Sequence, residues 1–189
     1  MAWGPLFQPA VITFLEVGAA ESLTATAQAI AAAYHLNAQL VMPTLIPGSL
    51  PLTLPGPVGI GAGLEASFKL AQAISSGPPP SSVWLPAASA VIAYWTGVQF
   101  SPLPPPPGGL LGTTNLVLFP GVPNTLAEDL GSAFKAGQPA QSAQEGAALV
   151  AAALSSAFQK HLLTVSGLWT GTAPGAPPVP FVFPWTGLS

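Results

Sequence analysis

The chain has 189 residues, of which 5% are charged and 50% are hydrophobic, and its formal net charge is −3. Its only cations are three lysines, too few to neutralise the phosphates on which nucleic-acid affinity depends, so we expect no direct nucleic-acid binding. The absence of cysteine excludes disulfides and thiolate-ligated metal sites.

The N-terminal part is predicted to be helical. The first twenty residues lack a basic start and are interrupted by Pro5, Pro9 and Glu16, so we expect no cleaved signal peptide. Residues 10–40 are predicted as helix with a break near Gly18, because small and apolar residues recur there at helical spacing.

A segment rich in proline and glycine follows, at residues 41–63, and predicts an extended connector. Its glycine-rich end, 56–63, lacks the lysine of a phosphate-binding loop and does not match the G-x-G-x-x-G spacing. We interpret it as part of the connector. A short helix is predicted over 64–76, ended by Gly77 and a triple proline.

The apolar stretch 83–100 has no charged residue and is about long enough to cross a bilayer. Pro86, the flanking prolines and the lack of lysine or arginine at either end favour a buried helix, with Ser82 as its N-cap. A membrane span remains the alternative. Residues 98–123 are predicted to be irregular, with a polyproline II stretch and a short strand at 115–119.

Two helix starts carry the capping-box pattern, in which a hydroxyl and a carboxylate each satisfy a free backbone N–H. Thr125 with Glu128 predicts one start, and Ser142 with Glu145 predicts the other. The second helix is predicted over 143–166 and has an apolar stripe at spacings of three and four: Val150, Leu154, Phe158, Leu162 and Val165.

The tripeptide Trp-Thr-Gly occurs three times. The first two copies follow apolar helical patterns and predict helix ends, with Gly97 and Gly171 in the left-handed position after the last turn. The third copy predicts an extended C-terminal segment with aromatic side chains at period two. We interpret five aromatic residues as interface anchors: Trp95, Trp169, Phe181, Phe183 and Trp185.

These patterns together predict a mainly α fold. We expect about five alanine-rich helices, joined by long extended segments rich in proline and glycine, with at most short strands. Residues 1–178 would form a single helical body with proline-rich connectors, and residues 179–189 a C-terminal docking arm. We expect removal of this arm to impair assembly and to leave the helical body folded.

The polar residues indicate no catalytic, cofactor or metal site. Neither His35 nor His161 has a carboxylate at the helical spacing that a metal site needs. Glu128 and Asp129 are adjacent on a predicted helix and point about a third of a turn apart, and capping already explains Glu128. We therefore expect no enzymatic activity, no cofactor and no small-molecule substrate.

The sparse charge instead indicates an assembly. A monomer of this composition would expose larger apolar patches than soluble monomers do, and burial between subunits would remove them. The partners would be copies of the chain and other subunits of the same assembly. Two alternatives remain: a membrane-associated protein using 83–100 or the amphipathic helix 143–166, and a module that binds small ligands or glycans through its tryptophans.

Three stretches, TNLVLFPGVPNTLAEDL, FQKHLLTVSGLWTG and VPFVFPWTGLS, alternate helix and extended arm with almost no basic residues. In this rhythm, which extends over most of the chain, the sequence resembles small virion structural proteins of tailed bacteriophages, including phages of cyanobacteria. The resemblance implies a non-enzymatic neck, tail, baseplate or capsid-decorating subunit in several symmetric copies. It also implies location in a virion that is assembled in the host cytoplasm.

Overall fold

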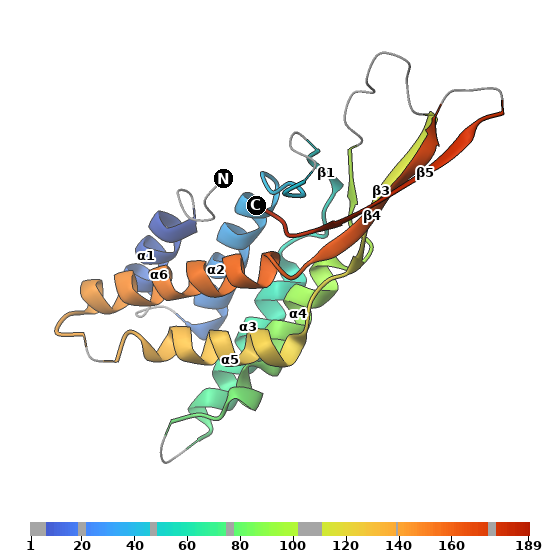
Figure 1. Cartoon of the computed structure of the whole chain (residues 1–189). Coiled ribbons are helices and arrows are strands. Elements are labelled where there is room, and N and C mark those ends of the chain that lie inside the picture. Colours follow the sequence, from blue (N-terminus) through green and yellow to red (C-terminus); the bar gives the residue numbers. More distant parts are fainter. Residues whose placement is uncertain are drawn as a thin grey trace.

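The computed structural model describes residues 7–18, 22–45, 49–74, 78–101, 111–138, 140–173 and 177–189. In this part of the chain, helices gather at one end and a sheet extends from them toward the other end (Figure 1). The helices are α1 Phe7–Gly18, α2 Leu23–Ala38, α3 Val58–Gln72, α4 Leu85–Trp95, α5 Pro123–Lys135 and α6 Ala143–Leu162, and a 3-10 turn, η1 Ser81–Trp84, precedes α4. The strands are β1 Pro51–Thr53, β2 Gln99–Phe100, β3 Leu111–Phe119, β4 Ser166–Ala173 and β5 Val179–Thr186.

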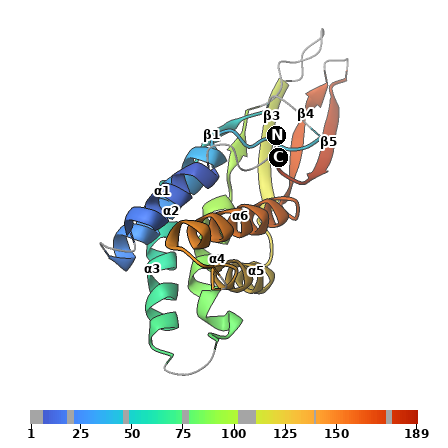
Figure 2. The same cartoon turned by 90° about the vertical axis from the view of Figure 1, so that its left-hand side faces the viewer.

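The helices form a closed ring. Each helix packs against the next one in the chain, and α6 returns to α1 (Figure 2). Aromatic rings fill the space between them, with Phe158 lying 4.7 Å from Tyr34 and 5.5 Å from Phe7 between ring centroids. These edge-to-face contacts are the preferred geometry of aromatic pairs, so α1, α2 and α6 share one core.

Helix α3 begins earlier than the sequence predicted. It starts at Val58, inside the segment 41–63 that we expected to be an extended connector, so the interpretation of its glycine-rich end was wrong. Gly61 lies against Ala31 of α2, and Gly63 lies so close to Pro86 and Ala90 of α4 that a Cβ would clash. Close packing against two helices therefore offsets the low helix propensity of these glycines.

The strands form one antiparallel sheet in the order β1-β2-β3-β4-β5. The predicted fold, mainly α with at most short strands, is therefore wrong. The strand expected at 115–119 is the second half of β3, which is nine residues long. The helix expected over 143–166 is shorter than predicted: α6 ends at Leu162, with Leu163 as its C-cap, and β4 begins at Ser166.

The C-terminal segment belongs to the sheet of its own chain. Residues 179–186 are β5, which pairs with β4 along its whole length, so they form a strand of the sheet and not the extended arm that we expected. Beyond β5, the N–H of Gly187 donates to Val165 at 2.8 Å, and Met42 and Ser189 exchange backbone hydrogen bonds of 3.0 and 2.9 Å. Removal of residues 179–189 should therefore destabilise the rest of the chain, contrary to the expectation from the sequence.

An aromatic column joins the helices to the sheet. Trp95 at the end of α4 stacks on Phe100 of β2, with ring centroids 6.5 Å apart, and Phe100 meets Trp185 of β5 edge to face at 5.7 Å. All three side chains are buried. Trp185 lies over Gly167 of β4, where a Cβ would collide with its indole ring and with the backbone oxygen of Leu116.

Substituting Gly167 by alanine tests this contact. We expect Gly167→Ala to lower the free energy of unfolding by about 3 kcal/mol, because the added methyl group has no space between a backbone oxygen and an indole. Urea denaturation followed by circular dichroism measures the change.

Gly59→Ala is the matched control, since nothing lies within 4 Å of the added Cβ there. We expect it to leave stability unchanged or to raise it by less than about 1 kcal/mol. Equal losses in the two variants would contradict the packing described here.

Candidate functional site

Two of the three Trp-Thr-Gly tryptophans are structural. The Nε1–H of Trp95 donates to the hydroxyl of Tyr34 at 2.6 Å, and the Nε1–H of Trp185 donates to Oδ1 of Asn115 at 2.7 Å. Both indoles are at most 1% exposed. They pack within their own chain and have no surface to offer another subunit, so their interpretation as interface anchors was wrong.

The glycines of the first two copies differ in conformation. Gly97 follows the C-cap Thr96 of α4 and has a φ of +73°, the left-handed geometry that glycine adopts without strain. Gly171 lies in the middle of β4, opposite Phe181, and its φ is not positive. The predicted helix end at Gly171 is therefore wrong, because α6 has already ended and the chain pairs there with β5.

The second copy belongs to an aromatic cluster on β4 and β5. Trp169 meets Phe181 edge to face at 5.1 Å and lies 6.5 Å from Phe183, and the two phenyl rings are nearly parallel at 6.2 Å. These three predicted anchors are half-buried. Unlike the other two tryptophans of the repeated triplet, Trp169 has a buried Nε1–H without a hydrogen-bond partner.

The two predicted capping boxes have different outcomes. Ser142 is the N-cap of α6 and accepts from the N–H of Glu145 at 3.1 Å, and Glu145 in turn accepts from the N–H of Gln141 at 2.8 Å. Helix α5 instead begins at Pro123, with Val122 as an N-cap that makes no side-chain bond. Proline needs no N–H partner and has a preset φ, so it starts this helix two residues before Thr125.

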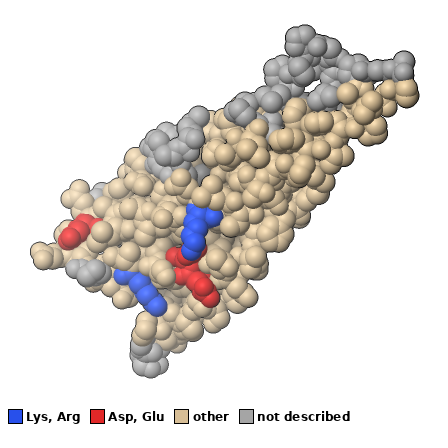
Figure 3. Space-filling view, in the orientation of Figure 1, with Lys and Arg blue, Asp and Glu red and all other residues tan. Residues whose placement is uncertain are grey.

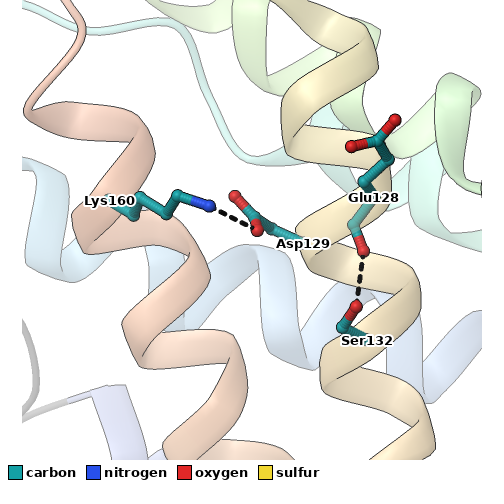
Figure 4. A network of polar contacts seen from close by, with 4 residues as sticks. All are labelled: Glu128, Asp129, Ser132 and Lys160. Carbon is teal, nitrogen blue, oxygen red and sulfur yellow. Dashed lines mark hydrogen bonds and ion pairs between the residues drawn. The ribbon is translucent and has the colours of Figure 1, made fainter.

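Glu128 is therefore an exposed residue in the interior of helix α5. The capping box that we expected it to form with Thr125 is absent, so this prediction was wrong. The backbone oxygen of Glu128 accepts from Ser132 at 3.0 Å. Its neighbour Asp129 points the other way and accepts from Lys160 of α6 at 2.8 Å (Figure 4). The two carboxylates do not face a common space, so they do not form an acid–base pair.

His161 is a buried histidine that lies at the end of α6. Its side chain is 5% exposed, its ring lies against the backbone of Gly121, and its buried Nε2 has no hydrogen-bond partner. Burial lowers the pKa of His161 to about 4, so the ring is neutral at pH 7.

A pocket of about 80 Å³ adjoins this histidine, lined by Val122, Thr125, Leu126, Asp129, Lys160, His161 and Thr164. It has room for a few water molecules and is well below the size of ordinary ligand pockets, about 300 Å³ or more. Within the described ranges, no three histidine or carboxylate side chains come together as a metal site.

The surface of the sheet is more informative. Its inner face packs on the helices and includes Asn115, Val117 and Trp185, all at most 3% exposed. Its opposite face, which we call the outer face, comprises the residues that pair in the same register as Leu168: Gln99, Thr114, Leu116, Phe119, Ser166, Leu168, Thr170, Thr172, Pro180, Val182, Pro184 and Thr186. Phe119 is 47% exposed and Val182 is 62% exposed, so within the described structure this charge-free face is in part uncovered.

Charge is segregated from this face. The charged residues whose side chains are described, Lys69, Lys135, Lys160, Glu65, Glu128, Asp129 and Glu145, all lie in α3, α5 and α6. The sequence has no lysine, arginine, aspartate or glutamate between Lys69 and Glu128 or after Lys160. Figure 3 accordingly shows charged atoms near the helices and none over the visible strands.

The edges of the sheet are blocked by proline. The N–H of Gly187 donates to Val165, so odd-numbered residues of β5 form the backbone hydrogen bonds to β4. The backbone N–H and C=O groups of even-numbered residues therefore point away from β4, toward the free edge of the sheet. Pro180 and Pro184 occupy two of the outward positions and have no N–H to donate. The opposite edge, β1, has only three residues and begins with Pro51, so neither edge is a template for another strand.

Sequence reasoning missed the outer face, although two signals were present. The long charge-free stretches were visible, and residues 116–119 and 179–185 are continuous apolar runs, the pattern of strands that are apolar on both faces. The prolines masked this signal, because proline is depleted in paired strands.

Comparison with known proteins adds no relative: no family model, curated protein or solved structure matches this chain. The helices in the described part of the chain are all too short or too polar to span a bilayer.

Acidification tests the burial of His161. In the unfolded chain its pKa is the ordinary 6.5, so between about pH 6.5 and about pH 4 the unfolded state binds a proton that the folded state does not. The free energy of unfolding should therefore fall by about 2 kcal/mol from about pH 7 to about pH 5. Urea denaturation at a series of pH values measures this loss.

The variant His161→Gln should lack this part of the pH dependence, whereas His35→Gln, which changes the histidine bonded to Tyr94, should retain it. If His161→Gln lost as much stability on acidification as the parent chain, the neutral buried histidine would be refuted.

Restoring donors at the edge tests the role of the prolines. We expect Pro180→Thr with Pro184→Thr to give β5 an unbroken outward row of N–H groups and to cause fibrous aggregation, measured by thioflavin T fluorescence. The control Val182→Thr adds no donor to the same edge and should not aggregate. A double variant as inert as this control would show that the prolines do not protect the edge.

Proposed function

We propose that this protein is a structural subunit of a large symmetric assembly and that it acts by protein–protein packing through the outer face of its sheet. The single observation that supports this proposal is the exposure of an apolar, charge-free sheet face at the end of the molecule remote from its charges. Exposed apolar patches of this kind mark interaction sites in soluble proteins.

Burying the outer face costs little free energy. Its hydroxyl groups at Thr114 and Thr170 already hydrogen-bond to each other across β3 and β4 at 2.9 Å. Its other central positions are Leu116, Leu168 and Pro184, which have no polar side-chain atom. No charge has to leave water, which would be the most costly part of forming an interface.

The charged end would keep the assembled subunit hydrated. Lys160 and Asp129 pair across α5 and α6, and Lys69 pairs with Glu65 within α3 at 2.6 Å. These groups lie on the helices and would remain in water when sheet faces pack together.

The more specific form of the proposal is a component of a tailed-phage virion, non-enzymatic and bound to copies of itself and to other virion subunits. The sequence resemblance described above supports it.

Light scattering of the purified full chain tests the proposal. We expect a mass that is a multiple of 18.9 kDa and that does not fall between about 0.05 M and about 1 M NaCl, because apolar contacts are not screened by salt. A monomer at every concentration would overturn the proposal. So would an oligomer that dissociates in high salt, because its contacts would then depend on charge.

A further inference from the structure

We infer that the outer face of one chain packs on the outer face of a second copy, sheet on sheet, about a two-fold axis. This inference rests on the proposed function and specifies the partner that covers the face. It follows from the charge, edges and side chains of the sheet.

Charge favours a second copy as the partner. The outer face has no ionised group on β2, β3, β4 or β5. A partner with charged residues in the contact would leave them buried without a counter-charge, which costs several kcal/mol per ion. A copy of the same face brings only leucine, valine, phenylalanine, proline, threonine, serine and glutamine side chains, so neither side is left with an unpaired charge.

The blocked edges determine how the copy can bind. A strand of a second chain cannot extend the sheet beside β5, because Pro180 and Pro184 remove two of its outward N–H groups. It cannot extend the sheet at β1 over more than three residues. Packing face to face remains, and sheets of this kind stack about 10 Å apart with their strands within about 30° of each other.

The side chains of the face suit a two-fold contact. Leu116, Leu168 and Pro184 stand directly opposite one another on three neighbouring strands, with Leu168 in the centre. Phe119 lies on one side of this row and Val182 lies on the other, and they are 47% and 62% exposed. Because a two-fold contact brings the same patch together from both chains, an axis through the central row places Leu168 next to its own counterpart.

The size of the face sets the strength of the contact. From Gln99 on β2 to Pro184 on β5 there are three strand spacings, about 14 Å, and strands of eight residues are about 27 Å long, which gives about 400 Å² per chain. Two faces would bury about 800 Å² in total, below the size of a stable specific interface and in the range of weak contacts. We therefore expect the dimer to dissociate on dilution.

A single cysteine at position 168 tests the geometry, because the chain has no cysteine of its own. We expect Leu168→Cys to form covalent dimers with a short bismaleimide. It should not form disulfides, because stacked sheets about 10 Å apart exceed the limit of about 7 Å between Cα atoms. Val58→Cys is the matched control: this residue is 81% exposed, lies at the start of α3 and should not cross-link.

A charge on the face provides a second measurement. We expect Val182→Lys to lower the oligomer mass in light scattering, whereas Val58→Lys should not change it; both wild-type side chains are exposed, so both variants should fold. An oligomer in which Leu168→Cys fails to cross-link and Val182→Lys leaves the mass unchanged would overturn this inference and leave the proposed function standing. A chain that is monomeric at every concentration would overturn both.

Discussion

The position of the Trp185 indole determines how the sheet is joined to the helices. This side chain lies against Gly167 of the neighbouring strand, meets Phe100 edge to face and donates to Asn115, so it connects β5, β4, β3 and β2 at one point. Phe100 then stacks on Trp95 at the end of α4. Because strand side chains alternate, fixing Trp185 inward also fixes Pro184 and Val182 outward. The exposed face is thus a consequence of the buried one.

Local signals in the sequence predicted some helix ends and failed at others, as at Thr125 and Gly171. Ser142 caps α6 as its spacing from Glu145 indicates, and Gly97 ends α4 in the left-handed conformation. The Trp-Thr-Gly triplet shows why the rest could not be predicted in the same way. Its first copy ends a helix, its second lies within β4, and its third joins β5 to the C-terminus. Pairing with residues far along the chain decides between these structures, and the tripeptide sequence alone does not determine that pairing.

The edges of the sheet are blocked by proline and its outer face is exposed, and these two properties favour ordered association. An open edge would accept any strand and extend without limit, whereas a face accepts only a surface of matching shape. The side-chain chemistry agrees with this interpretation, since the carboxylates Asp129 and Glu65 form ion pairs with lysines and His161 is neutral and enclosed. In the proposed assembly, recognition would depend on shape and apolar contact.

The spacing of the two prolines in β5 also limits how the chain can vary in length. Pro180 and Pro184 are separated by an even number of positions, so both point away from the ladder. Inserting or deleting one residue between them would turn one proline inward, where it would break a hydrogen bond, and would move the residues on one side of the change to the opposite face of the sheet. Within this strand, only changes of two residues keep both the ladder and the two faces, so length variation among homologous sequences should be confined to segments outside the paired strands.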